Sequence, residues 1–333
     1  MEFRTLGSTG MRVSEVGFGC GDNAGLMVRG SASERDRVVG RALDLGINFF
    51  DTAAMYGSNT SEINLGETLH ALNAKPLISS KLWLVAPDLD DIPAAVEKAI
   101  DASLRRLQVD HLDLIELHNS VVEQRVLEPG SFPLGPKLSA EDVLGPGGVV
   151  EGFEKARSAG KVRFFQTFTR RKEFIESGRF HSIMEGYNLI NPTAGRLPPP
   201  GFSQADHGQT IDQAAANGLG VVVIRALAMG AASGQKERPT INTPPTQTPG
   251  MEAEYQENQR RSRALGFLIR DDQSLAQAAI KFALMKKEVS TVLLGFATEE
   301  HVIEAASCSG SPGLTDAELQ KLEALYQSDF GGS

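Results

Sequence analysis

The sequence predicts an α/β fold: a closed (β/α)8 barrel, or TIM barrel, with an N-terminal β-hairpin and long loops over its C-terminal rim. One reason is that short apolar runs alternate with helical patterns, which is typical of a parallel sheet covered by helices. A second reason is that eight such runs can be counted, the number that closes this barrel. A chain of 333 residues is also long enough for two ordinary domains, but the alternation favours one barrel domain over residues 1–333.

The elements are expected in the following order. Gly7-Ser8-Thr9-Gly10 separates two short runs, residues 2–6 and 11–14, and indicates the hairpin. The eight barrel strands are expected at residues 16–20, 47–51, 77–82, 112–117, 161–167, 183–187, 220–224 and 290–294. Helical patterns cover residues 33–45, 61–72, 92–107, 149–159, 210–217, 274–285 and 298–306.

Two segments interrupt this alternation. Residues 121–148 and 231–250 are rich in proline and glycine, and they follow the fourth and the seventh predicted strands. Long connections in a compact domain are often functional, although both segments also fit plain surface insertions. Because they follow strand ends, we expect both to lie over the C-terminal rim.

The composition argues against several classes of protein. A net charge of −9 disfavours a nucleic-acid or anionic-membrane partner. No apolar run reaches the roughly 18 residues of a membrane span, and no leader-like segment opens the chain. The two cysteines, Cys20 and Cys308, lie far apart, so a reducing, cytoplasmic location is expected rather than a disulfide framework. No spacing of histidine and cysteine suggests a metal.

Four polar residues fall at or just beyond the ends of predicted strands. Asp51 ends the second strand and Tyr56 follows five residues later, while Lys81 and His118 lie at the ends of the third and fourth. In such a barrel these ends share one rim, where catalytic residues gather. A tyrosine with a pKa near about 10 becomes a better acid when a lysine stabilises its anion. A carboxylate beside that lysine and a histidine facing a carbonyl would complete a site for protonating a carbonyl oxygen.

Several segments carry a resemblance to a known family. In chain order they are Leu6-Gly7-Ser8-Thr9-Gly10-Met11-Arg12-Val13-Ser14, Gly46-Ile47-Asn48-Phe49-Phe50-Asp51-Thr52-Ala53, Tyr56-Gly57, Ser61-Glu62, Leu65-Gly66-Glu67, Ser79-Ser80-Lys81-Leu82-Trp83 and Asp113-Leu114-Ile115-Glu116-Leu117-His118-Asn119. Together, with the spacing of the four polar residues, they resemble the aldo-keto reductase superfamily over most of the chain.

The resemblance implies a barrel that binds NADPH or NADH across its C-terminal rim. Hydride would pass between the nicotinamide and a small carbonyl or alcohol substrate, such as an aldehyde, a ketone or a sugar. Carried over by position, Tyr56 corresponds to the general acid and base, and Lys81 to the group that lowers its pKa. Asp51 would pair with Lys81, and His118 would place the carbonyl. No GxGxxG follows a strand, so a Rossmann-type site is not indicated.

Two further residues are assigned to the substrate pocket. Trp83, the only tryptophan, follows Lys81 by two residues and is expected to line the pocket, or else to pack under the rim. Cys20 ends the first strand and could face the same pocket, but it also fits a small buried hydrophobe. The catalytic candidates have structural alternatives too: taken alone, Asp51 could cap a turn and Lys81 could extend its stem along the surface.

The nicotinamide end departs from the family pattern. Relatives carry Gly-Val-Ser-Asn or Gly-Phe-Thr after the fifth strand, whereas this chain has Gln166-Thr167-Phe168-Thr169. Thr169 or Gln166 would have to contact the carboxamide. Met184 stands where a glutamine is usual, and a thioether cannot replace the paired donor and acceptor of an amide. Tyr187 still matches the family, so Thr169 and Tyr187 are the candidates here.

The adenosine end departs as well. Arg225 and Leu227 lie in a segment that resembles the pyrophosphate loop, with Arg225 an unusual cation there. After the last strand, Gly295, Thr298 and His301 are the candidate phosphate contacts.

Four neighbours in that stretch are unfavourable. Ala297 and Ala305 replace polar contacts of the family. Glu299 and Glu300 would repel a 2′-phosphate, which weakens the case for NADPH, or would simply complement a helix N-terminus.

Three functional interpretations follow. The first is an NAD(P)-dependent oxidoreductase, which the four polar residues favour. The second is a family member that binds nucleotide as a regulatory or scaffold signal. The third is a barrel that has lost dinucleotide binding and acts as a regulatory or ligand-binding protein; Phe168, Met184, Ala297 and Ala305 favour it. We take the first as the prediction.

Overall fold

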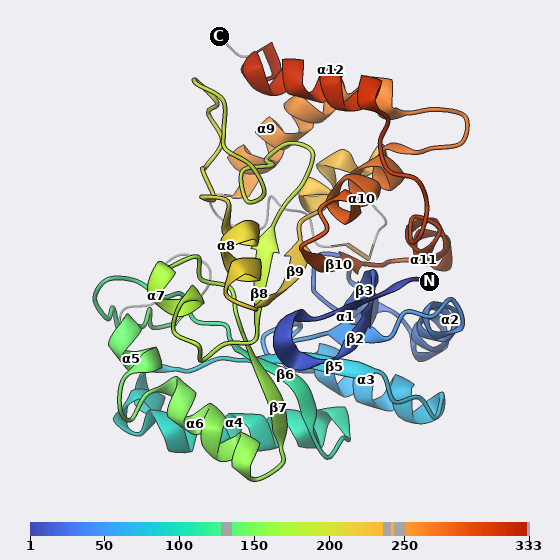
Figure 1. Cartoon of the computed structure of the whole chain (residues 1–333). Helices are drawn as coiled ribbons and strands as arrows, with labels where there is room; N and C mark the ends of the chain where they lie inside the picture. Colours follow the sequence, from blue (N-terminus) through green and yellow to red (C-terminus); the bar gives the residue numbers. More distant parts are fainter. Residues whose placement is uncertain (128–134, 236–240, 243–250, 332–333) are drawn as a thin grey trace.

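The computed structural model describes residues 1–127, 135–235, 241–242 and 251–331. Eight parallel strands close into a barrel in the order β10-β3-β4-β5-β6-β7-β8-β9, which confirms the predicted (β/α)8 fold (Figure 1). The strands are β3 (Val16–Gly19), β4 (Phe49–Asp51), β5 (Leu77–Leu82), β6 (Leu112–Leu117), β7 (Val162–Thr167), β8 (Ser182–Gly186), β9 (Gly220–Ile224) and β10 (Val289–Gly295). Each of the eight predicted strands is present, with ends that differ by at most two residues.

Helices surround the barrel. They are α1 (Leu26–Arg29), α2 (Ala32–Asp44), α3 (Thr60–Ala71), α4 (Ile92–Leu107), α5 (Ala140–Leu144), α6 (Val149–Ser158), α7 (Lys172–Ile175), α8 (Thr210–Ala216), α9 (Met251–Ser262), α10 (Leu275–Met285), α11 (Glu299–Ala306) and α12 (Asp316–Gln327). Seven of them follow the predicted ranges closely, whereas α1, α5, α7, α9 and α12 were not predicted. In Figure 1, α9, α10 and α12 gather at one end of the molecule, whereas α3, α4 and α6 lie at the opposite end.

Local sequence explains where several helices begin. The side chain of Ser31 accepts a hydrogen bond from the backbone of Glu34, whose side chain accepts one in return, and this capping box starts α2. Thr315 with Glu318 starts α12 in the same way. Asp91 caps α4 and Pro93 occupies its first turn, where its missing N–H costs nothing. These short signals determine where the three helices begin.

The N-terminal hairpin closes the floor of the barrel. Its strands β1 (Phe3–Thr5) and β2 (Arg12–Ser14) pair antiparallel, as predicted. Side chains of the hairpin pack into the barrel interior with residues from the strands: Leu6, Met11, Val13, Phe49, Leu114, Met184, Val222 and Leu293 form this cluster. Gly7 has φ +50°, and a Cβ there would lie 2.2 Å from the backbone of Gly220, so a glycine is required. An apolar floor leaves the opposite rim as the open end.

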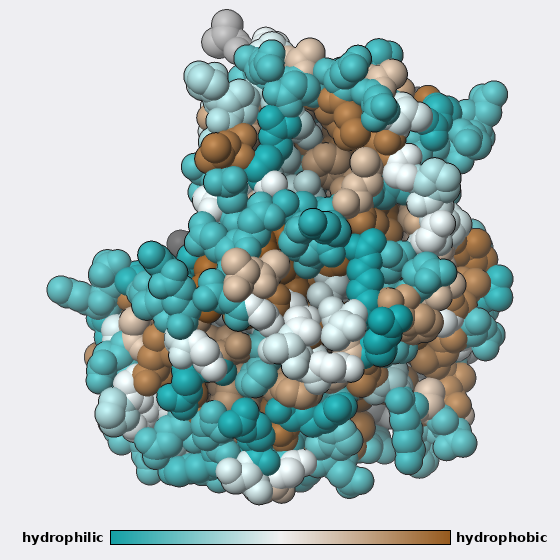
Figure 2. Space-filling model, in the orientation of Figure 1, coloured by the Kyte–Doolittle hydropathy of each residue, from teal (hydrophilic) through white to brown (hydrophobic). Residues whose placement is uncertain are grey.

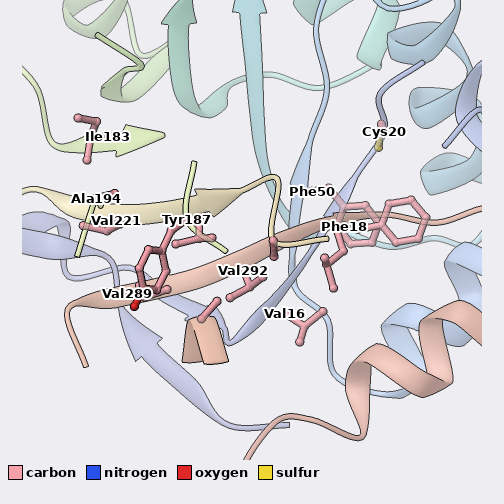
Figure 3. Close-up of a cluster of buried hydrophobic side chains, with 14 of the residues drawn as sticks. Val16, Phe18, Cys20, Phe50, Ile183, Tyr187, Ala194, Val221, Val289 and Val292 are labelled. Atoms are coloured by element: carbon pink, nitrogen blue, oxygen red, sulfur yellow. The ribbon is translucent and has the colours of Figure 1, made fainter. Parts of the chain in front are cut away.

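A second core lies between the strands and the helices. Figure 3 shows part of it, with Phe18 and Phe50 side by side; their rings stack at a centroid distance of 5.0 Å. Cys20 and Tyr187 also belong to this core. The face of the molecule in Figure 2 is largely hydrophilic, with apolar residues in small groups. No helix in the described ranges has the length and apolar character that crossing a bilayer requires.

The two long connections differ from the simple loops expected. The segment 121–148 contains the short helix α5, and its residues 128–134 lie outside the described part of the chain. The segment 231–250 begins inside the 3-10 helix η3 (Ala228–Ser233), and its residues 236–240 and 243–250 likewise lie outside the described part. The described residues Gln235 and Asn242 line the cavity at the C-terminal rim, as the position of this segment predicts.

Candidate active site

The strand ends bring the four predicted residues together at the C-terminal rim. Asp51 is the last residue of β4, Lys81 lies one residue before the end of β5, and His118 directly follows β6. Tyr56 lies in the turn after β4, before α3 begins. Because these strands are neighbours in the barrel, the four side chains approach one another without help from the long loops.

A buried ion pair forms the base of this cluster. The ammonium group of Lys81 donates a short hydrogen bond to Oδ1 of Asp51 and a second, of 2.9 Å, to the carbonyl of Thr52. The side chains of Lys81 and Asp51 are 1% and 3% exposed. Such a pair depends on both partners, since removing one would leave the other as an unpaired buried charge.

The aromatic residues stand over this pair. Nζ of Lys81 lies 5.0 Å from the centroid of the Tyr56 ring. The imidazole of His118 meets the Tyr56 ring edge to face, with centroids 5.8 Å apart and planes at 85°. Trp83 also meets His118 edge to face, with ring centroids 6.1 Å apart and planes at 82°. Tyr56, His118 and Trp83 are each half-buried, so the group borders open space.

Burial determines the protonation states of Tyr56 and His118. Loss of hydration raises the pKa of Tyr56 to about 12, although the Lys81 ammonium acts in the opposite direction. Burial lowers the pKa of His118 to about 3, and Lys81 adds to that effect. Tyr56 is therefore a protonated phenol and His118 a neutral imidazole at neutral pH. Nδ1 of His118 has no hydrogen-bond partner among the described residues.

The lysine and the carboxylate respond to each other. Burial disfavours the charged form of Lys81, but the carboxylate of Asp51 outweighs it and raises the pKa of Lys81. Burial also raises the pKa of Asp51, and Lys81 counteracts this. We therefore assign the proton to the ammonium group. Cys20, beside this pair, has a raised pKa because it is buried, and it remains a thiol.

A cavity of about 370 Å³ begins at this cluster and extends along the rim. Asp51 and Tyr56 line one end, and His301, Glu304 and Ala305 of α11 line the other. Between them lie the ends of β8, β9 and β10 and the helix η3. Two residues that line it, Arg225 after β9 and Met229 within η3, have φ values of 56° and 59°, which non-glycine residues adopt uncommonly.

The candidate cofactor residues divide into two groups. Arg225, Leu227, Gly295 and His301 line the cavity. Thr298 caps α11, where its hydroxyl accepts a hydrogen bond from the backbone N–H of His301 at 3.4 Å.

The remaining candidates lie outside the lining of this cavity. Thr169 borders a separate depression with Ser120, Val121 and residues 168–171. The ring of Tyr187 is buried and stacks on Phe282 at 5.1 Å. Cys20 is buried in the core, and Trp83 packs on His118.

The departures from the family pattern border the same cavity. Met184, Ala297 and Ala305 all line it. Gln166, considered above as a substitute for the missing amide, points into the barrel instead: its amide donates to Glu116 at 2.8 Å and accepts from Ser182 at 3.1 Å. Gln166 is thus committed elsewhere.

The acidic residues of α11 differ in what they contact. Glu299 pairs with Arg41 at 3.7 Å, which supports the interpretation that it is an ordinary first-turn acid of α11. Glu304 lines the cavity and accepts a hydrogen bond from Ser274 at 2.6 Å. The acid that borders the cavity is therefore one that the sequence did not single out. In the described part of the chain, no group of three His, Cys, Asp or Glu side chains has the arrangement of a metal site.

One residue of the cluster escaped the sequence analysis. Glu116 is fully buried in β6 and lies in register with Lys81 of β5. Burial raises its pKa to about 7, while Lys81 counteracts and Asp51 adds to the shift. The sequence carried a signal for this residue: Glu116 precedes His118 by two positions, and residues two apart along a strand point to the same face.

Similar proteins are found along the whole chain. The chain is 28% identical to L-galactose dehydrogenase of Arabidopsis thaliana over 344 aligned positions, covering 98% of this chain and 95% of that protein. The structure of a glycerol dehydrogenase from Gluconobacter oxydans superposes with a TM-score of 0.73 at 20% identity, covering 100% of this chain and 97% of the other. An aldo-keto reductase from Klebsiella pneumoniae in complex with NADPH gives a TM-score of 0.67 at 18% identity, covering 98% and 96%.

The family model matches over nearly the whole chain. It is described as the Aldo/keto reductase family, and it covers residues 15–327. This match confirms the resemblance read from the segments around Asp51, Lys81 and His118. The chain belongs to the Aldo/keto reductase family.

Proposed function

We propose that the protein is an NAD(P)-dependent oxidoreductase that transfers hydride between a nicotinamide and the carbonyl or alcohol carbon of a small substrate. The observation that carries the proposal is the cluster at one end of the rim cavity. There the Tyr56 ring stands over the buried Lys81–Asp51 pair and against a neutral His118. Family membership supports the class of reaction.

The cavity fits a dinucleotide in its extent and in part of its lining. It runs from Tyr56 to α11, and Arg225 supplies a cation for a pyrophosphate. Leu227, Gly295 and His301 are the other residues that would hold the cofactor. When bound, the nicotinamide supplies or accepts the hydride. Glu304 at the far end disfavours an added phosphate, which weakens the case for NADPH relative to NADH.

Tyr56 is proposed as the general acid in carbonyl reduction. Its pKa of about 12 keeps the hydroxyl protonated at neutral pH, so the proton is available for the carbonyl oxygen. The phenolate that this transfer leaves lies beside the Lys81 ammonium, which stabilises it electrostatically. In alcohol oxidation the same phenolate accepts the hydroxyl proton.

His118 and Trp83 are proposed to orient the substrate. His118 stays neutral, so it can donate a hydrogen bond to the carbonyl oxygen without competing for the proton of Tyr56. Trp83 packs against the imidazole and limits its movement. The similarity to L-galactose dehydrogenase supports an aldose as the substrate class.

A second candidate function rests on the cavity lining. Met184, Ala297 and Ala305 offer no hydrogen bonds where a dinucleotide would need them, and Gln166 is committed to Glu116. These features favour a family member with weak or lost dinucleotide binding that acts as a regulatory or ligand-binding protein. The two functions differ in one measurable property, the affinity for the cofactor.

The test is a titration of the purified protein with NADPH and with NADH in separate experiments. Trp83 is the only tryptophan, so quenching of its fluorescence reports binding at the reactive end, and calorimetry gives an independent affinity. Binding of either cofactor, followed by turnover of glyceraldehyde or of L-galactose, supports the oxidoreductase. No binding of either at millimolar concentration would reject it in favour of the second function.

A further inference from the structure

A row of polar side chains crosses the barrel interior directly below the catalytic cluster. Lys81 of β5 is in register with Glu116 of β6, Glu116 with Gln166 of β7, and Gln166 with Ser182 of β8. Residues in register on neighbouring parallel strands share a face and lie on strands about 4.8 Å apart. Leu114, two residues before Glu116, belongs to the cluster inside the barrel, so Glu116 points inward as well.

Glu116 is held firmly in this row. The Gln166 amide donates to its Oε2 at 2.8 Å, and the Ser182 hydroxyl in turn donates to Gln166 at 3.1 Å. Glu116 is 1% exposed, and Gln166 and Ser182 are fully buried. This fixed chain of hydrogen bonds orients the carboxylate from the side away from Lys81. It leaves Lys81 as the cation beside it on the neighbouring strand.

The charges around Glu116 come from several elements. Lys81 of β5 and Asp51 of β4 act on it most strongly. Lys81, Asp51 and Glu116 itself all shift the pKa of Tyr56, which lies in the turn after β4. His118, directly after β6, and Cys20, after β3, remain neutral. Two carboxylates therefore face one ammonium group. A third anion, the phenolate of Tyr56, would have to share the same cation.

We propose that Glu116 is a positioning residue of the active site: its carboxylate competes with the Tyr56 phenolate for the ammonium group of Lys81 and keeps Tyr56 in its acid form. This inference rests on the proposed function and deepens it. With Glu116 ionised, Tyr56 serves carbonyl reduction over the neutral and mildly alkaline range, and it works as the base for alcohol oxidation only in more alkaline solution. The Tyr56 proton passes to the carbonyl oxygen in the first case and returns from the alcohol in the second.

The sign of the expected effect follows from the charges. Burial raises the pKa of Glu116 to about 7, so Glu116 is an anion throughout the alkaline range in which Tyr56 titrates. Replacing it by an uncharged residue removes one negative charge near the phenol. The phenolate then becomes easier to form, and the titration of Tyr56 moves to lower pH by about one unit.

The experiment compares Glu116→Gln with the wild-type protein by NMR of ring-13C-labelled tyrosine. The chain has four tyrosines, and the resonance of Tyr56 is the one missing in Tyr56→Phe. In Glu116→Gln, this resonance should begin to shift about one pH unit lower than in the wild type. The glutamine can still accept from Gln166, so the row of hydrogen bonds is kept. Should Glu116→Gln fail to fold, Glu116→Met removes the same charge with a similar volume.

Two variants serve as controls. Glu116→Asp keeps the charge and should titrate like the wild type. Glu62→Gln removes another fully buried carboxylate, one that pairs with Arg106 on the outer side of β5, and it should leave Tyr56 unchanged. An unchanged Tyr56 titration in both uncharged Glu116 variants, or an equal shift in Glu62→Gln, overturns the inference.

A parallel measurement separates this inference from the proposed function. The pH profile of glyceraldehyde reduction should lose its alkaline limb about one pH unit earlier in Glu116→Gln. Absence of turnover in the wild type would count against the proposed function, while the NMR titration still decides what Glu116 does to Tyr56. Normal turnover with identical profiles in wild type and Glu116→Gln would overturn the inference alone.

Discussion

The two ends of the rim cavity are built in different ways. At the reactive end, Asp51 and Lys81 lie within strands, are almost fully buried and are bonded to each other. At the far end, Arg225 lies in a turn with a left-handed backbone and pairs with Glu254 at 3.1 Å, and both side chains are about half exposed, at 47% and 46%. One end is fixed by the barrel and the other by turns, η3 and α11.

This difference accounts for the family residues kept at the reactive end and for the departures at Ala297 and Ala305. The pairing register of β4, β5 and β6 holds Asp51, Lys81 and His118 close together. The far end depends on side chains such as Ala297 and Ala305, which can change without disturbing a strand. Changes at the reactive end should therefore abolish chemistry or stability, whereas changes at the far end should alter affinity.

The largest effect is expected for Tyr56→Phe. The variant keeps the ring against His118 but loses the proton donor, and general acid catalysis contributes about 10²–10⁴-fold. We expect kcat for carbonyl reduction to fall by that factor, measured by NADPH or NADH oxidation. The dissociation constant of the cofactor, from Trp83 quenching, should stay the same. Wild-type turnover in this variant would remove Tyr56 from the acid role.

Lys81→Met should lower stability as well as activity. Removing the ammonium leaves Asp51 buried without its cation, and breaking a buried pair in this way costs about 3–5 kcal/mol. Urea unfolding followed by circular dichroism measures the loss. The double variant Asp51→Asn with Lys81→Met serves as the control, since it removes both charges and should recover much of the stability. Equal stability of the single and the double variant would show that the pair is not held as described.

The same difference between the two ends of the cavity limits what can be predicted from the sequence. The strand ends and the four polar residues could be predicted, because the alternation of apolar runs and helical patterns locates the strands. The barrel then brings the ends of these strands together. Helix α12 was missed although Thr315 and Glu318 form a capping box before it. Helix α9 was missed because its surface is polar nearly all round, with Asn258, Arg261 and Ser262 as its buried residues.

Side-chain direction was the second limit. Tyr187 follows β8 as expected, but its ring turns into the core against Phe282 rather than toward the cavity. Gln166 was a candidate for the nicotinamide, and its place in a buried row with Glu116 depends on the register between β6 and β7. Register is set by contacts between distant segments, so a pattern within one segment does not reveal it.

At the far end, Arg225→Ala should weaken cofactor binding. The variant removes a cation that lines the cavity, and for a half-exposed group we expect about a tenfold increase in the dissociation constant of NADPH and NADH alike. Calorimetry measures it. Glu254→Gln is the matched control: it frees Arg225 from its partner and should tighten binding slightly. Unchanged affinity in Arg225→Ala would mean that the phosphates do not reach this turn.

The smallest effect is expected for Met184→Gln, and it has the opposite sign. Met184 lines the cavity beside the reactive end, and a glutamine there adds an amide that can donate and accept toward a carboxamide. One such hydrogen bond contributes about 0.5–1.5 kcal/mol, so cofactor affinity should rise about fivefold with kcat unchanged. Met184→Leu has a similar volume without an amide and should bind as the wild type does. A gain in the leucine variant would assign the effect to packing, and no gain in either would mean that the nicotinamide lies away from β8.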